Sequence, residues 1–108
     1  MFISIIIPVR EINDYIRQAM PFYQNLQYND FEILIFPDID STEIFPKARI
    51  IPTGTIGPAE KRDLAIKYAK GEIFAFIDDD AYPRSDWLIN AIGHFKNNEI
   101  ASVGGPAM

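Results

Sequence analysis

The 108-residue chain contains no cysteine, a single histidine and no long hydrophobic run. The absence of cysteine excludes disulfides and thiolate metal sites, so a bound metal would be held by oxygen ligands or by His94. The apolar segment 2–9 is too short to span a bilayer, and it lacks the basic leader and cleavage site of a signal peptide. We therefore expect a cytoplasmic protein that could meet a membrane only through parts outside this chain.

Basic residues are also few. Ten Lys and Arg residues stand against fifteen Asp and Glu residues, which gives a net charge of −5. This balance argues against a nucleic-acid partner, because duplex binding needs a broad basic face, whereas a nucleotide held through a metal remains compatible. With 48% hydrophobic residues, the chain can form one modest core, and we expect a single domain over residues 1–108.

Short apolar segments alternate with amphipathic ones, which predicts an α/β fold with a mostly parallel sheet flanked by helices. The predicted strands cover residues 2–7, 31–36, 49–51, 73–77 and 100–103. The predicted helices cover 13–26, 58–70 and a segment from 85 or 86 to 98. Pro21 should kink or shorten the first helix.

In the second predicted helix, we assign Lys61 to the polar face and Gly71 to the C-terminal stop. The chain ends directly after a strand and a Gly-Gly-Pro turn, so we expect it to be a fragment of a larger domain.

Three consecutive aspartates, Asp78, Asp79 and Asp80, follow the apolar strand 73–77. In open α/β folds, ligands bind at the carboxyl ends of the strands. Carboxylates this close repel one another and need a cation, and the hard divalent metals that hold phosphates prefer oxygen ligands. The sequence therefore predicts metal-assisted handling of a phosphorylated ligand, with a solvated loop as the alternative interpretation.

Five segments resemble, in chain order, the N-terminal half of family 2 glycosyltransferases, and they cover nearly the whole chain. They are SIIIPVR (4–10), FEILI (31–35), GPAEKRDLA (57–65), AKGEI (69–73) and FIDDDAYP (76–83). The resemblance implies a nucleotide-sugar-binding half domain of the Rossmann-like GT-A fold. It also implies a metal-dependent, inverting enzyme that transfers a sugar from a nucleoside diphosphate sugar to an unknown acceptor hydroxyl. Among such donors, we expect a UDP-sugar.

The resemblance further implies roles for residues at the first two strand ends. The backbone of Pro8, Val9, Arg10 and Glu11 lies beside the base and ribose in such enzymes. An acidic residue after the second strand hydrogen-bonds the base, and either Asp38 or Asp40 can fill this role.

In the second half of the chain, the resemblance places Arg62 near the nucleotide. Asp78 and Asp79 contact the nucleotide, and Asp78 with Asp80 holds the Mn²⁺ or Mg²⁺ that bridges the two phosphates. The family's catalytic base and acceptor-binding segments lie further along than residue 108, so we assign no base and expect the isolated chain to be inactive.

Three alternatives remain open. In a haloacid-dehalogenase-like phosphatase, Asp38 would attack phosphorus, Asp40 would act as acid and base, and Asp78 with Asp79 would hold Mg²⁺. A nucleotidyltransferase would use a similar layout, but it usually carries a glycine-rich loop that is missing after the first strand. A non-catalytic nucleotide-binding module is the third alternative.

Overall fold

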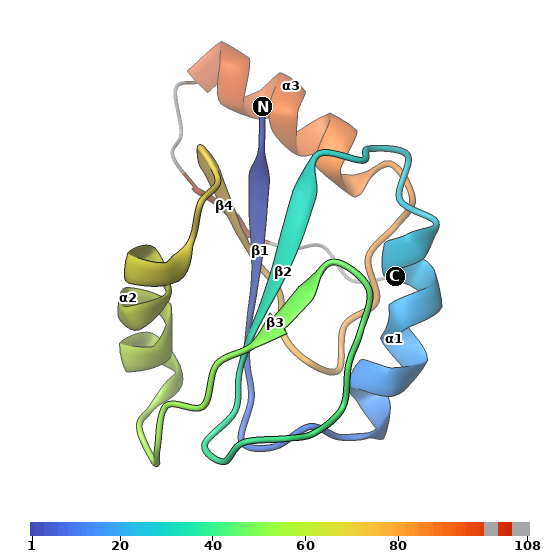
Figure 1. The fold of residues 1–108 in the computed structure, drawn as a ribbon. Helices are drawn as coiled ribbons and strands as arrows, with labels where there is room; N and C mark the ends of the chain where they lie inside the picture. The colour runs from blue at the N-terminus through green and yellow to red at the C-terminus, as the bar shows by residue number, and fades with distance from the viewer. Residues whose placement is uncertain (99–101, 105–108) are drawn as a thin grey trace.

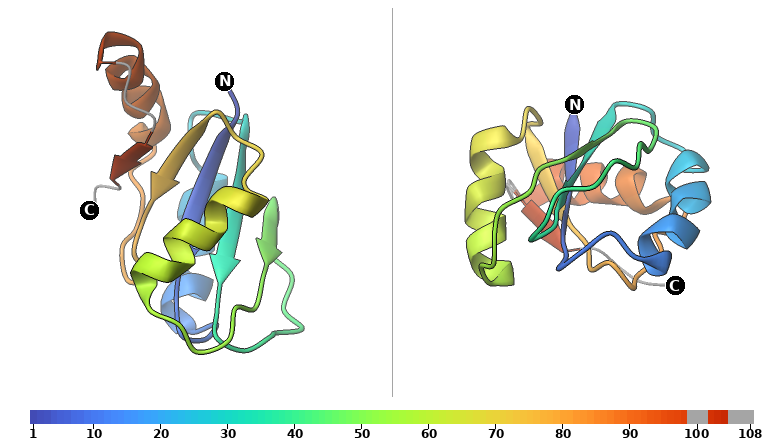
Figure 2. Two further views of the ribbon diagram at one scale, coloured as in Figure 1. Left: turned by 90° about the vertical axis from the view of Figure 1, so that its left-hand side faces the viewer. Right: turned by 60° about the horizontal axis from the view of Figure 1, so that its bottom comes forward.

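The computed structural model describes residues 1–98 and 102–104, and it forms a parallel sheet with helices on both faces (Figure 1). The strands are β1 (Ile3–Pro8), β2 (Phe31–Phe36), β3 (Ala48–Ile50), β4 (Ile73–Phe76) and β5 (Ser102–Gly104), in the spatial order β3-β2-β1-β4-β5. The helices are α1 (Asp14–Gln24), α2 (Pro58–Tyr68) and α3 (Trp87–Asn98). Helix α2 covers one face of the sheet, and α1 and α3 cover the other (Figure 2). The predicted α/β class is confirmed.

The central strand β1 pairs in parallel with β2 on one side and with β4 on the other. Its alternate residues Ile3, Ile5 and Ile7 belong to the large core cluster that includes buried residues of α1 and α3. Ile6 belongs to a smaller cluster on the α2 face, together with Ala65. Because both faces of the sheet are covered, β1 is apolar nearly throughout rather than alternating with polar residues.

Helix α1 begins after Asn13, as predicted, because the side-chain oxygen of Asn13 accepts a hydrogen bond from the Ile16 amide at 3.0 Å. Pro21 lies inside the last turn, and the helix ends at Gln24, two residues before the predicted end. The helix nevertheless continues for three residues beyond the proline, and the Asn25 amide donates to the Pro21 carbonyl at 3.1 Å.

Two predictions about α2 are wrong. The helix ends at Tyr68, and Ala69 takes an extended conformation at the C-cap, so Gly71 does not stop the helix. A Cβ atom on Gly71 would lie 2.6 Å from the Ser4 backbone nitrogen, which means that glycine is needed here for close packing against β1. Lys61 does not belong to the polar face, because it is only 2% exposed.

Strand β2 covers the predicted residues 31–36, whereas the bounds of the other strands differ from prediction by one or two residues. Strand β3 begins one residue earlier than expected, and β4 ends at Phe76 rather than at residue 77. Residues 100 and 101 of the last predicted strand lie outside the described part of the chain, and β5 itself extends to Gly104. No helix among the described residues is long and apolar enough to cross a bilayer.

A buried polar network connects the C-terminal end of α2 to the sheet. The Ser4 hydroxyl donates to Glu32 at 2.6 Å, and the Lys70 amide donates to the same carboxylate oxygen at 2.8 Å. Arg49 donates to the other oxygen at 3.2 Å and also to the Tyr68 carbonyl at 2.8 Å. Burial alone would raise the pKa of Glu32, but the hydrogen bonds from Ser4, Lys70 and Arg49 outweigh it and lower this pKa.

We predict that Glu32→Gln destabilises the protein at neutral pH and does so less in acid. Because the folded-state pKa of Glu32 is lowered, its contribution is present above the ordinary value of 4.5 and is lost as the pH falls below it. Urea unfolding should show a loss of about 1–3 kcal/mol at neutral pH, since a charged hydrogen-bonding group is removed. The matched control Glu72→Gln, at an exposed position, should change the unfolding free energy by less than about 0.5 kcal/mol. If the loss of unfolding free energy in Glu32→Gln stayed constant down to acid pH, the ionised Glu32 carboxylate would not be the stabilising group.

Candidate functional site

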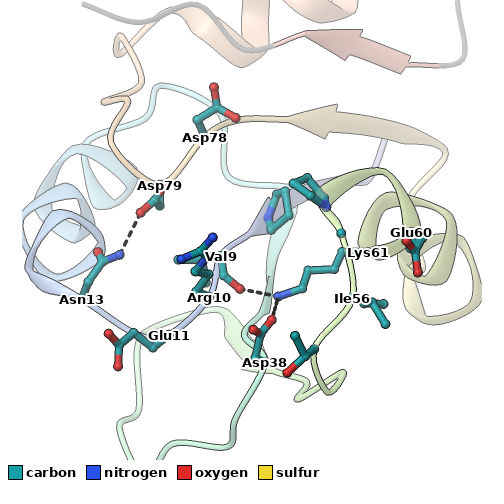
Figure 3. A pocket seen from close by; sticks show the side chains of 14 residues that line it. Val9, Arg10, Glu11, Asn13, Asp38, Ile56, Glu60, Lys61, Asp78 and Asp79 are labelled. Carbon is teal, nitrogen blue, oxygen red and sulfur yellow. Dashed lines mark hydrogen bonds and ion pairs between the residues drawn. The ribbon is translucent and has the colours of Figure 1, made fainter.

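A cavity of about 960 Å³ opens at the carboxyl ends of β1 and β2, between the first turns of α1 and α2 and the loop after β4 (Figure 3). Its lining includes the following residues with a role predicted from the sequence: Pro8, Val9, Arg10, Glu11, Asp38, Asp78 and Asp79. Parallel strands end at the same edge of the sheet, which is why segments far apart in the sequence meet here.

Three predicted site residues are not among the described residues that line the cavity: Asp40, Arg62 and Asp80. Asp40 is exposed, and its carboxylate accepts a hydrogen bond from the neighbouring Ser41 amide at 2.8 Å. Asp38, by contrast, lines the cavity.

Arg62 and Asp80 lie near the cavity but outside its lining. An Arg62 guanidinium nitrogen is 3.9 Å from Asp78 Oδ1, and the guanidinium lies over the Phe76 ring at 5.9 Å. The Arg62 Nε atom is buried and has no hydrogen-bond partner within the described residues. Asp80 is exposed.

The backbone segments after β1 and β2 remain paired beyond the strands themselves. The Val9 amide donates to the Phe36 carbonyl at 3.2 Å, and the Asp38 amide donates to the Arg10 carbonyl at 2.8 Å. These bonds continue the parallel ladder into the cavity wall. They fix the Asp38 backbone beside the Val9–Arg10 backbone.

Lys61 joins these two segments to α2. Its ammonium group donates to the Val9 carbonyl at 2.5 Å, to the Phe36 carbonyl at 3.0 Å and to Asp38 Oδ1 at 2.5 Å. This role of Lys61 was not predicted from the sequence. A usable signal was the spacing of Lys61 four residues before Ala65, the most buried residue of α2, because residues i and i+4 share one face of a helix.

Asn13 is a second site residue that the sequence analysis did not identify. Its side-chain oxygen caps α1, and its side-chain nitrogen donates to Asp79 Oδ2 at 2.7 Å. One side chain thus fixes both the start of α1 and the loop after β4. Asp79 is held toward α1, whereas the Asp78 side chain points elsewhere and is 73% exposed (Figure 3).

Acidic groups outnumber basic groups five to two in the cavity lining. The acidic residues are Glu11, Asp38, Glu60, Asp78 and Asp79, and the basic residues are Arg10 and Lys61. A diphosphate would be repelled from such a lining unless a cation accompanied it.

The donor set near Asp78 does not form a complete metal cage. Within residues 1–98 and 102–104, no three acidic or histidine side chains converge as metal ligands. The exposed carboxylates of Asp78 and Asp80 do fit a cation that takes one or two protein ligands and completes its shell with phosphate oxygens and water, as Mg²⁺ does.

Residues 4–108 match the family described as Glycosyl transferase family 2. The chain belongs to this family. The resemblance expected from the sequence is therefore confirmed. The phosphatase alternative loses support as well, because Asp40, its expected acid and base, is exposed and is not among the described residues that line the cavity.

Two curated relatives of this family 2 chain are themselves glycosyltransferases by name. A poly(ribitol-phosphate) beta-glucosyltransferase of Bacillus spizizenii is 31% identical over 92% of this chain. An uncharacterized glycosyltransferase of Haemophilus influenzae is 27% identical over 95% of this chain. The chain spans only 18% of the first relative and 46% of the second.

Solved structures of glycosyltransferases share the fold of the family 2 chain. TarS of S. aureus in complex with UDP-GlcNAc has a TM-score of 0.72 at 24% identity, over 92% of this chain and 32% of that one. Mannosyltransferase PcManGT of Pyrobaculum calidifontis in complex with GDP-Man and Mn²⁺ has a TM-score of 0.77 at 20% identity, over 91% and 33%. The predicted GT-A fold is thereby confirmed.

The two roles of Asn13 can be separated by exchanging it with Asp79. Asn13→Asp keeps a good helix cap but replaces the donor to Asp79 with a carboxylate, so it should lower the unfolding free energy by about 1–2 kcal/mol. The double variant Asn13→Asp with Asp79→Asn restores one donor and one acceptor and should recover most of this loss. Urea denaturation measures both, and an Asn13→Asp variant as stable as the wild type would show that the Asn13–Asp79 bond contributes nothing.

Proposed function

We propose that this chain is the nucleotide-sugar-binding part of a metal-dependent glycosyltransferase that transfers a sugar from a UDP-sugar to an acceptor hydroxyl. The observation that carries the proposal is the acidic cavity at the carboxyl ends of the parallel strands of a family 2 chain. The neighbouring structures supply support for a nucleotide-sugar donor, since they contain UDP-GlcNAc or GDP-Man.

In this proposal, the wall formed by Pro8, Val9, Arg10 and Glu11 receives the base and the ribose. Asp38 accepts a hydrogen bond from the base, because its carboxylate lies in the cavity lining beside this wall. The paired backbone after β1 and β2 supports this arrangement, since a rigid wall positions a ligand better than a free loop.

The diphosphate would lie toward the loop after β4. Asp78 and Asp80 would hold Mn²⁺ or Mg²⁺, with the remaining ligands from the two phosphates and from water. When bound, such a cation stabilises the negative charge that develops on the leaving diphosphate. Asp79 contributes to the nucleotide side of the loop, fixed there by Asn13.

Arg62 would act beside Asp78 rather than in the wall of the base pocket. Its guanidinium is close to the Asp78 carboxylate, and its buried Nε has no partner within the described residues. A phosphate oxygen at the edge of the cavity would be a suitable acceptor for such a donor.

The proposed transfer is a single displacement with inversion. The acceptor hydroxyl attacks the anomeric carbon, a carboxylate base takes the hydroxyl proton, and the nucleoside diphosphate leaves with the electron pair of the glycosidic bond. We assign no residue of this chain as that base. The acceptor contacts are also expected from a further part of the domain.

Calorimetric titration with UDP, GDP and CDP, with and without Mn²⁺, tests the proposal. We expect UDP to bind in a manganese-dependent way, and Asp80→Asn to weaken this binding by about tenfold or more, because a charged metal ligand is lost. The matched control Asp30→Asn removes the same charge at the opposite edge of the sheet, before β2, and should leave the affinity unchanged. Failure of the folded chain to bind any of the three nucleotides with Mn²⁺ would contradict the proposal, and unchanged UDP affinity in Asp80→Asn would reject the metal assignment.

A further inference from the structure

Lys61 is a buried cation in the wall of the cavity. Its side chain is 3% exposed, and its three ammonium hydrogens meet three acceptors: the Val9 and Phe36 carbonyls and Asp38 Oδ1. Burying a charge is costly unless it is paired and fully hydrogen-bonded. Lys61 meets both conditions, and Asp38 is the carboxylate that balances its charge.

The contacts of Lys61 fix the orientation of the Asp38 side chain. Oδ1 is engaged with the ammonium at 2.5 Å, and the side chain as a whole is 20% exposed. Figure 3 shows the carboxylate pointing toward Lys61 in the cavity wall. Within the described residues, the other oxygen, Oδ2, accepts no protein hydrogen bond and is left for a ligand.

We propose that Lys61 is a positioning residue that fixes which atom of residue 38 faces the nucleotide base. This inference rests on the proposed function, because it assumes that the cavity receives a nucleotide. Both oxygens of the Asp38 carboxylate accept hydrogen bonds, and because Lys61 holds Oδ1, Oδ2 is the acceptor presented to the base. It favours bases that carry a ring N–H donor, uracil or guanine, over cytosine, whose corresponding ring nitrogen is an acceptor.

The amide variant Asp38→Asn reveals whether Lys61 sets this orientation. An ammonium group has only donors, so it must face the amide oxygen of the new side chain. The amide NH₂ then takes the place of Oδ2 and offers a donor to the base. Uracil should be disfavoured and cytosine favoured, since its ring nitrogen accepts such a bond.

Removing Lys61 from the same variant should cancel the reversal. In Lys61→Met with Asp38→Asn, nothing forces the amide oxygen toward α2, so the amide can rotate and serve either base. A purely structural role of Lys61 would weaken all ligands together and would leave the ratio between the bases unchanged. The ratio of affinities is therefore the decisive quantity.

The experiment measures UDP, CDP and inorganic pyrophosphate binding, each with Mn²⁺, in five proteins. These are the wild type, Lys61→Met, Asp38→Asn, the double variant and the control Lys67→Met, which removes an exposed lysine of the same helix. We expect a wild-type preference for UDP over CDP of about tenfold or more, since a hydrogen bond to a charged group is at stake. Asp38→Asn should reverse the preference toward CDP, and the double variant should bring the ratio near one.

Pyrophosphate and the control separate the possible failures. Pyrophosphate affinity should be the same in all five proteins, because it does not involve the base, and Lys67→Met should behave as the wild type. If the wild type binds neither nucleotide, the proposed function fails, and this inference fails with it. If the wild type prefers UDP but Asp38→Asn does not shift the ratio toward CDP, the positioning role of Lys61 is refuted while the proposed function stands. Asp38→Asn keeps Lys61 but removes the carboxylate that balances its charge, so an unchanged pyrophosphate affinity must first show that the site of this variant is folded.

Discussion

The structure depends on the parallel pairing of β1 with both of its neighbours. Six residues of β1 pair with β2 and four with β4, from Ile3 onward, so the three strands run in one direction and end at one edge. Every segment that leaves this edge begins within reach of the others. The residues after β1, β2 and β4 therefore form one cavity wall although up to seventy positions separate them along the chain.

Much of this arrangement could be predicted from the sequence, because it follows from local patterns. Apolar runs marked the strands, and an Asn at the right place marked the start of α1. The triple aspartate could be placed at the strand ends for the same reason. What could not be predicted are contacts between distant residues. The helical pattern of α2 is compatible with an exposed Lys61, and only the carbonyls of Val9 and Phe36 with Asp38 make its burial favourable.

Asp38 and Asp40 are a second case in which contacts between distant residues could not be predicted from the sequence. The two residues differ by two positions and are chemically identical, so their sequence context does not separate them. The difference arises because the Asp38 backbone is still paired with Arg10, whereas Asp40 is exposed and its carboxylate accepts a hydrogen bond from the adjacent Ser41 amide. Among the described residues that line the site, Lys61 is the one buried cation, and its charge balances that of Asp38. The negative charge of a diphosphate would therefore have to be balanced by a bound cation rather than by side chains of the cavity wall.

Helix α2 is attached to the sheet by a small apolar contact and by polar contacts at both of its ends. Its apolar contact with the sheet centres on a small cluster around Ala65, while polar contacts fix both ends: Lys61 at the first turn, and the Glu32–Arg49 network at the last. Helices α1 and α3, in contrast, pack on the large core. The two layers therefore differ in what loosens them. Protonation of Glu32 weakens the polar contacts at the end of α2, because the hydrogen bonds that Glu32 accepts hold its pKa below the ordinary value, whereas the apolar packing of α1 and α3 on the large core carries no such charge.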